Sequence, residues 1–340
     1  MVSVTTTTVA LVAFAVSFDL LVGEPRTRWH PVAWFGTIVG LVDRDWDLDT
    51  GNERWLGLVV ALVFPAAAAG LVGGLVGLAG FVHPTVAALL AGVVLFLTTS
   101  LRSLLELTEA VVEESKSDPE TARQTVRGLA GRDASSLSPA QLRSAAIESA
   151  AENLADGFVA TLAPFVLLAP VSLPAAAAAA TWVKAVNTLD SMLGYPDKPI
   201  GTASARLDDV VMWLPARLTA GSLALAAGRP RALATARQWV RTPPSPNSGW
   251  PMAVAAVVLS VRLEKPDVYA LNPAGREPTG TDGDRAVRLV GVGAIVALLV
   301  LVVATIALDA GVVGATGVPG VADVAAITDQ QHSLTPEGPP

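Results

Sequence analysis

The stretch VRLVGVGAIVALLVLVVATIAL, residues 287–308, decides the fold class of this chain. Its length is close to the roughly 20 apolar residues that an α-helix needs to cross the hydrocarbon core of a bilayer. Its one charged residue, Arg288, lies near the start, where a long side chain can reach the polar interface. The sequence therefore predicts a membrane-spanning helix here.

Three further apolar runs predict spans, near residues 4–22, 56–82 and 85–101. The second and third are separated only by the pair His83-Pro84, which predicts a transmembrane hairpin. No Lys or Arg precedes the first run, and no small-residue cleavage site follows it, which favours a span over a signal peptide.

Two more apolar stretches are not typical of ordinary membrane-spanning helices. Residues 158–183 contain three prolines, each of which removes a helical hydrogen bond or ends a helix, so we expect a broken or re-entrant hairpin. Residues 207–227 carry Asp208, Asp209 and Arg217, and charges are costly at the bilayer centre. We expect this segment to lie at the membrane surface or to line a polar cavity.

The composition supports the same fold class, because 52% of the 340 residues are hydrophobic and only 16% are charged, against about 25% in soluble domains. The chain has no cysteine, which excludes disulfides, thiolate metal sites and a cysteine nucleophile. The formal net charge of −7 argues against a nucleic-acid partner, which would need a basic surface. We predict an all-α, multi-pass membrane protein with broken or re-entrant helices.

Positive charge predicts the orientation. Arginines follow the first apolar run, at Arg26, Arg28, Arg44 and Arg54, whereas the chain after Leu308 has no basic residue. Because basic loops stay cytoplasmic, both termini should lie outside, and the active-site loops should face the cytoplasm at the cell membrane. We expect one polytopic domain over residues 1–310 and a flexible tail over residues 311–340, poor in aromatic residues.

The densest polar motif lies within residues 145–157, where Glu148, Glu152 and Asp156 recur at i, i+4 and i+8. On a helix these acids project from one face, and like charges at that spacing are unfavourable. A Mg²⁺ ion that carries a nucleotide would compensate them, since Mg²⁺ prefers carboxylate and phosphate oxygens. The alternative is a solvated acidic face.

A second polar motif covers residues 184–209. Lys184 and Arg206 have the chemistry to hold phosphate, and Asp190, Asp208 and Asp209 to hold a metal ion or accept a proton. The alternative for Asp208 and Asp209 is that they cap the N-terminus of a helix beginning near Leu207.

Weaker candidates complete the set. The loop at residues 243–251 offers neutral polar groups, although its composition also suits a simple turn. Asp19 lies within an apolar run, which marks it as a functional candidate, and His30 before a proline is more often structural. The candidate catalytic residues are Glu148, Glu152, Asp156 and Asp190. The candidate metal ligands are Glu152, Asp156, Asp208 and Asp209. The candidate substrate- and phosphate-binding residues are Lys184, Asn187, Arg206, Arg217, Ser245, Asn247 and His30.

Six motifs in order resemble the adenosylcobinamide-phosphate synthase family of cobalamin biosynthesis, from about Asp19 to Tyr269. They are DLLVGEP (19–25) with WHP (29–31), GRD (131–133), ESAAENLADG (148–157), NTLDSMLGY (187–195), SARLDD (204–209) and SPNSGW (245–250). The chain departs from the family pattern at Pro196, where a basic residue is usual, and in the late Pro164 after the acidic motif.

The resemblance implies a membrane amide ligase that uses ATP and Mg²⁺. It would couple adenosylcobyric acid, a corrinoid, to (R)-1-amino-2-propanol or its O-phosphate, and pass the product to other membrane-bound cobalamin-assembly enzymes. Two other functions stay open. A transporter would place its polar residues within the spans, and a noncatalytic corrinoid-binding scaffold would not need the intact set of acids.

Overall fold

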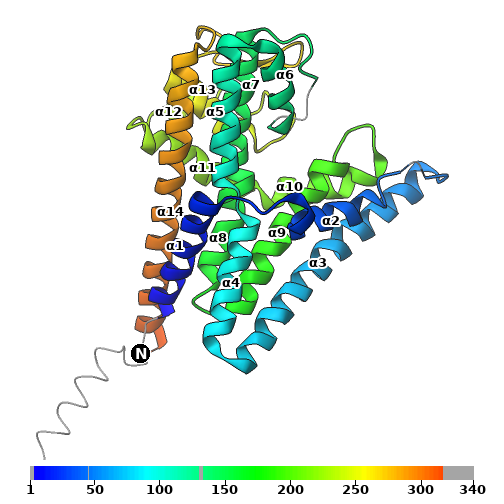
Figure 1. Ribbon diagram of the computed structural model, residues 1–340, viewed down its shortest axis with the longest axis vertical. Helices are drawn as coiled ribbons and strands as arrows, with labels where there is room; N and C mark the ends of the chain where they lie inside the picture. The colour runs from blue at the N-terminus through cyan, green and yellow to red at the C-terminus, as the bar shows by residue number, and fades with distance from the viewer. Residues whose placement is uncertain (1–3, 45, 130–132, 317–340) are drawn as a thin grey trace, which may run out of the picture.

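The computed structural model describes residues 4–44, 46–129 and 133–316, and within them the fold is almost entirely helical, as predicted (Figure 1). The helices are α1 (Val4–Val22), α2 (Pro31–Gly40), α3 (Thr50–Val82), α4 (Pro84–Thr98), α5 (Leu101–Ser117), α6 (Pro119–Thr125), α7 (Pro139–Leu154), α8 (Ala160–Leu168), α9 (Leu173–Leu193), α10 (Thr202–Val211), α11 (Trp213–Ala226), α12 (Ala232–Ala236), α13 (Gly249–Leu259) and α14 (Gly280–Thr316). The short helical turns are η1 (Thr27–Trp29), η2 (Val126–Gly128), η3 (Ala155–Val159) and η4 (Pro199–Gly201). One antiparallel hairpin, β1 (Leu263–Lys265) with β2 (Tyr269–Leu271), was not predicted.

Four helical stretches in the described part of the chain are long and apolar enough to cross a membrane: Thr50–Val82, Pro84–Ser117, Pro139–Leu168 and Gly280–Ala307. Three of them coincide with predicted spans, and α1 occupies the predicted residues 4–22 as a shorter apolar helix. The stretch Pro139–Leu168 was not predicted, because the acids of α7 obscure its apolar character. The protein is therefore an all-α protein of membrane type.

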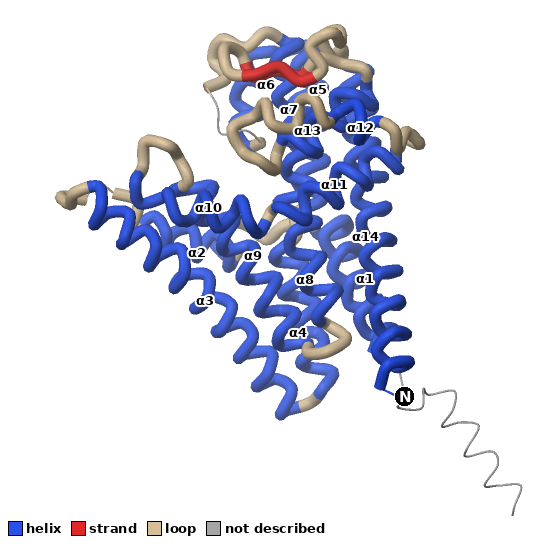
Figure 2. The backbone as a smooth tube through the Cα atoms, turned by 180° about the vertical axis from the view of Figure 1, so that it is seen from behind, coloured by secondary structure: helices blue, strands red, loops and turns tan. Residues whose placement is uncertain are grey.

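The helices form two groups along one long helix at the edge of the molecule. Figures 1 and 2 show α1, α4, α8 and α9 in one group and α5, α6, α7 and α13 in the other, with α14 running along both. Helix α3 leans away at an angle, and α10 lies across the middle of the molecule. The hairpin covers the outer end of the second group (Figure 2).

The broken hairpin expected over residues 158–183 is present. Helix α8 ends at Leu168, and α9 begins at Leu173, where the Ser172 hydroxyl accepts a hydrogen bond from Ala175 N and Pro174 occupies the first turn. Proline is tolerated there because the first helical N–H groups have no partner within the helix. The two helices then pack against each other.

Asp19 has a structural role in the fold. Its side chain is 1% exposed, and Oδ2 accepts hydrogen bonds from the backbone N–H groups of Leu101 (3.1 Å) and Arg102 (2.9 Å), so it caps α5 from α1. Arg102 in turn donates to the carbonyls of Leu20 and Leu21 at the end of α1. Each helix thus satisfies the open terminus of the other.

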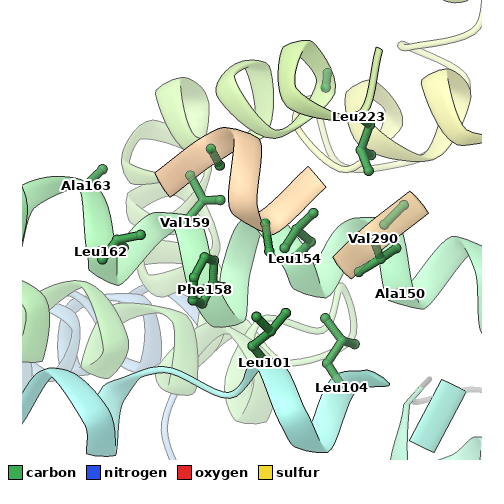
Figure 3. Packing of buried hydrophobic residues seen from close by; sticks show 14 of the residues in the cluster. Leu101, Leu104, Ala150, Leu154, Phe158, Val159, Leu162, Ala163, Leu223 and Val290 are labelled. Atoms are coloured by element: carbon green, nitrogen blue, oxygen red, sulfur yellow. The ribbon is translucent and has the colours of Figure 1, made fainter. Parts of the chain in front are cut away.

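The apolar core joins both groups of helices. Figure 3 shows Leu101 and Leu104 of α5, Leu154 and Phe158 near the end of α7, and Leu223 of α11 within it. Burial of such side chains is worth about 1.5–3 kcal/mol each. The core therefore fixes the point where α7 passes into α8.

The predicted tail begins inside the last helix, because α14 continues to Thr316, beyond the expected boundary at residue 311. The remaining predicted tail, residues 317–340, lies outside the described residues.

Gly201 allows α10 to follow closely on the end of α9. A Cβ at this position would lie 1.6 Å from the carbonyl oxygen of Leu193, so Gly201→Ala forces the backbone apart. We expect a loss of about 3 kcal/mol in unfolding free energy, at the upper end for overpacking, measured by thermal or denaturant unfolding in detergent. Gly221→Ala in α11 is the matched control, because a Cβ there meets nothing within 4 Å. Equal stability of the two variants would contradict the close approach.

Candidate active site

Four acids from separate segments line one small cavity. Glu152 of α7, Asp156 of η3, Asp190 of α9 and Asp208 of α10 all contribute to its wall, and the cavity volume is about 70 Å³. A water molecule occupies about 30 Å³ in the liquid. The cavity, here called the acid cavity, therefore has room for a cation or a terminal phosphate group but not for a whole nucleotide.

The turn η3 sets the position of Asp156. It is a π-helix, in which the N–H of Ala160 donates to the carbonyl of Ala155, five residues back. The backbone N–H of Ser100 also donates to the carbonyl of Gly157 at 3.1 Å, which ties this turn to the break between α4 and α5. π turns of this kind occur often at functional sites.

Asp208 does not cap a helix, so the alternative interpretation of Asp208 and Asp209 is wrong. Helix α10 begins at Thr202, and both acids lie in its second half, where a negative charge is unfavourable to the helix dipole. Asp208 is 9% exposed, and its Oδ1 atom is buried without a hydrogen-bond partner among the described residues. Burial and the nearby charge of Asp190 raise the pKa of Asp208 to about 8, although a hydrogen bond with Asn187 opposes this shift.

The loop at residues 245–250 closes one side of the acid cavity. The Asn247 side chain is buried, accepts a hydrogen bond from Arg217 and donates one to the carbonyl of Asp209 at 2.7 Å. Ser245 Oγ accepts from the N–H of Asn247 at 3.2 Å. The loop is therefore more than a turn, because its amide joins α10 to α11.

Arg217 holds this arrangement from α11. Its guanidinium lies 4.8 Å from the ring centroid of Trp213 and 5.4 Å from that of Trp250, and it also donates to the carbonyl of Trp213 at 2.8 Å. Stacking between two indole rings fixes the planar fork of the side chain. In this structure Arg217 orients Asn247.

Glu148 lies apart from the other acids. It is fully buried, and it accepts hydrogen bonds from Ser144 Oγ (2.8 Å) and the Tyr269 hydroxyl (2.6 Å), but it does not line the acid cavity. The shared acidic face expected from the spacing therefore holds for Glu152 and Asp156 only. Glu148 links α7 to β2 in this structure.

Five of the seven predicted substrate- and phosphate-binding residues do not line the acid cavity: Arg217, Arg206, Lys184, His30 and Asn187, the last of which hydrogen-bonds to Asp208. Arg206 is exposed, and its position two residues before Asp208 places the two side chains on different faces of α10. Lys184 and His30 line a second cavity on the other side of α9. His30 also caps α2, since its Nδ1 accepts from the N–H of Val32 at 3.2 Å, which agrees with a structural role.

Sequence reasoning missed part of the cavity wall. Met212, Ala216, Ser248 and Pro251 also line it. Ser248 belongs to the motif of residues 245–250, so its signal was present, whereas nothing in the sequence distinguishes the apolar residues from ordinary core. Of the motif at residues 131–133, Gly131 and Arg132 lie outside the described residues.

The residues of the acid cavity fit a cation that brings its own ligands. Among the described residues, no three Asp, Glu or His side chains stand together as a preformed metal site. Mg²⁺ usually binds through one or two carboxylates, and waters and substrate phosphates complete its shell. The buried Oδ1 atom of Asp208, which has no hydrogen-bond partner among the described residues, has the chemistry of such a ligand.

Similarity to known proteins identifies the family of this chain. A family model described as CobD/Cbib protein matches residues 12–299. The chain belongs to the CobD/Cbib family. The match covers every residue that lines the acid cavity.

Curated members of the CobD/Cbib family agree in their names. The probable cobalamin biosynthesis protein CobD of Methanothermobacter thermautotrophicus is 36% identical over 296 residues, covering 83% of this chain and 92% of the relative. The cobalamin biosynthesis proteins CobD of Rhodobacter capsulatus and Klebsiella pneumoniae are each 35% identical, covering 82% and 83% of this chain and 92% and 93% of the relatives. No solved structure matches the chain. Family membership therefore gives the chain a role in cobalamin biosynthesis.

Proposed function

We propose that this CobD/Cbib protein is an adenosylcobinamide-phosphate synthase. It would join a propionate carboxylate of adenosylcobyric acid to the amine of (R)-1-amino-2-propanol or of its O-phosphate, with cleavage of ATP to ADP and phosphate. The observation that carries this proposal is the convergence of Glu152, Asp156, Asp190 and Asp208 on one cavity in a chain of this family.

The reaction needs activation of a carboxylate, which is a poor acyl donor. Transfer of the terminal phosphoryl group of ATP to the carboxylate gives an acyl phosphate, and the neutral amine then attacks the acyl carbon and expels phosphate. The amine loses one proton in this step. No protein nucleophile is required, which agrees with a chain that contains no cysteine.

The acid cavity supplies the groups that such a reaction needs. Asp156 and Asp208 would hold a Mg²⁺ ion together with the phosphates, and that ion would neutralise the charge that develops during phosphoryl transfer. Asp190 and Glu152 line the same cavity, and either carboxylate would accept the proton once the amine has reached the acyl phosphate there. Because the cavity is small, the adenosine moiety would lie outside it.

A transporter is the second candidate. Its polar residues would line a path within the spans, and the stretch Pro139–Leu168 does carry acids. The structure argues against a transport path, because these acids share a cavity wall with the loop of residues 245–250. A hydrogen bond between Arg217 and Asn247 holds this loop in place. The buried Oδ1 atom of Asp208, which has no hydrogen-bond partner among the described residues, likewise favours catalysis over a noncatalytic corrinoid-binding scaffold.

A coupling assay tests the proposal. Membranes containing the protein are incubated with adenosylcobyric acid, ATP, Mg²⁺ and either form of the amine, and products are separated by chromatography. We expect one amide bond to form for each ATP consumed, and none without ATP. Uptake of a corrinoid into sealed vesicles without amide formation would favour a transporter instead.

We also propose that the acid cavity opens to the cytoplasm at the cell membrane. The exposed residue Asp197 lies between α9 and α10 and, because the chain has no cysteine, Asp197→Cys introduces a unique thiol. An impermeant maleimide should label this thiol in inside-out vesicles and not in right-side-out vesicles. Labelling from the external side would contradict this orientation.

A further inference from the structure

A second cavity, of about 350 Å³, is lined by another face of α9 and contains none of the residues of the acid cavity. Its wall is built from the segment after α1, the start of α2, the break between α4 and α5, and α9. We call it the amine cavity. Most of the wall is small or uncharged, including Ala33, Gly36 and Thr188.

Two opposite charges face this cavity. Glu24 contributes a carboxylate from the segment after α1, and Lys184 contributes an ammonium group from α9. They act on each other electrostatically, yet within the described residues no ion pair of 4.0 Å or less joins them. A partly buried ammonium group without a close partner is costly. A ligand with an anionic group at one end and an ammonium group at the other would satisfy both charges.

Helix α9 connects this cavity to the acid cavity. Lys184 and Thr188 are one turn apart and line the amine cavity, whereas Asp190 lies on another face and lines the acid cavity. Lys184 also interacts electrostatically with Asp156, which lines the acid cavity. A ligand held by Lys184 would therefore lie next to the proposed reaction centre.

The size of the cavity limits the ligand. Pockets for drug-sized ligands measure about 300–1,000 Å³, and this one is at the lower end, so it cannot enclose a corrinoid. An amino alcohol phosphate has about nine non-hydrogen atoms and fits the space. His30 adds a neutral polar group, because burial lowers the pKa of its imidazole.

We propose that the amine cavity binds the small amine substrate as its phosphate ester, with Lys184 contacting the phosphate and Glu24 contacting the ammonium group. The proposal rests on the proposed function, since it assigns a site to one of its substrates. It predicts that the two forms of the amine depend differently on Lys184.

Direct binding tests the site without catalysis. The purified full chain in detergent is titrated calorimetrically with 1-amino-2-propanol O-phosphate and with 1-amino-2-propanol, without ATP or corrinoid. Lys184→Met should weaken binding of the phosphate ester at least thirtyfold and change binding of the alcohol less than threefold. Glu24→Gln should weaken binding of both about tenfold, because it removes the contact that both share.

Two further variants complete the experiment. Ala33→Phe fills the cavity without changing its charge and should abolish binding of both amines, which keeps the proposal testable if Lys184→Met does not fold. Lys198→Met is the matched control, because Lys198 pairs with Asp43 at 2.6 Å and lines neither cavity, and it should bind as wild type does.

The outcomes separate this site from the proposed function. ATP-dependent coupling by the wild type, with unchanged binding in Lys184→Met and Ala33→Phe, would overturn the site and leave the ligase intact. Binding that is lost in these variants, in a wild type that does not couple, would support the site and count against the ligase. Failure of the wild type to bind either amine overturns the site.

Discussion

Asp156→Asn should reduce the rate of ATP-dependent coupling by a factor on the order of 10²–10³ while the protein still inserts and folds. The substitution removes one charge at nearly constant volume from a group that lines the acid cavity, where the proposed function places the phosphates. Loss of one electrostatic contact to the transition state costs about this much. Glu152→Gln, on the same wall, should also lose activity. Coupling is measured in membranes at saturating substrates.

Two controls decide what such a loss means. Glu106→Gln changes an exposed acid of α5 that pairs with Arg102 at 2.6 Å, so it should couple at the wild-type rate. Glu148→Gln changes an acid outside the acid cavity, and we expect its turnover per folded molecule to fall less than tenfold. Wild-type coupling by Asp156→Asn would show that this acid has a structural role only.

Asp208→Asn should reduce the rate of ATP-dependent coupling by a similar factor. It should also change how the free energy of unfolding depends on pH. The pKa of Asp208 is about 8 in the fold, against about 3.9 in an unfolded chain. Between these values the folded state binds more protons than the unfolded state, so the free energy of unfolding falls as the pH rises from about 4 to about 8. An asparagine does not titrate, and the variant should therefore lose most of this decline.

Magnesium provides the second part of the same test. A divalent cation binds the ionised carboxylate, so Mg²⁺ should raise the melting temperature of the wild type more at pH 8 than at pH 6, and this increment should shrink in Asp208→Asn. Glu152, Asp190 and Asp209 also act electrostatically on Asp208, so some pH dependence should remain. Asp197→Asn, an exposed change, should follow the wild type in thermal scans at each pH. If the melting temperatures of the wild type and of Asp208→Asn depended on pH and Mg²⁺ in the same way, the proposed role of Asp208 as a titrating metal ligand would be refuted.

Much of the helical framework could be predicted because hydrophobic length and proline are local signals. The run of residues 4–22 became α1, and the prolines of residues 158–183 marked the break between α8 and α9. The acids that line the acid cavity were among the predicted candidates, since carboxylates within apolar sequence are rare. The family motifs also marked Asp190, Asp208 and Asn247 as candidate site residues before any contact was known.

The errors arose where distant contacts decide the role of a residue. Asp19 lies within an apolar run, and the sequence does not show that its Oδ2 atom accepts hydrogen bonds from backbone groups of α5, more than eighty positions away. The helix that carries Asp208 begins at Thr202, because Gly201 lets the chain fold tightly over the end of α9. Glu148 shares the spacing of Glu152 and Asp156, yet it accepts a hydrogen bond from the hydroxyl of Tyr269, which belongs to a hairpin that was not predicted. None of these partners is visible in the local sequence.

The π turn at η3 has a consequence for how this protein can change during evolution. A π turn holds one residue more than an α turn, and one residue corresponds to a rotation of about 100° around a helix axis. Deleting a residue between Ala155 and Val159 would rotate α8 relative to α7, and the buried Phe158 and Phe165 would turn with it. The orientation of Asp156 and the packing of the core are thus inherited together. Insertions and deletions should therefore be tolerated in the surface loops of this protein and purged from this single turn.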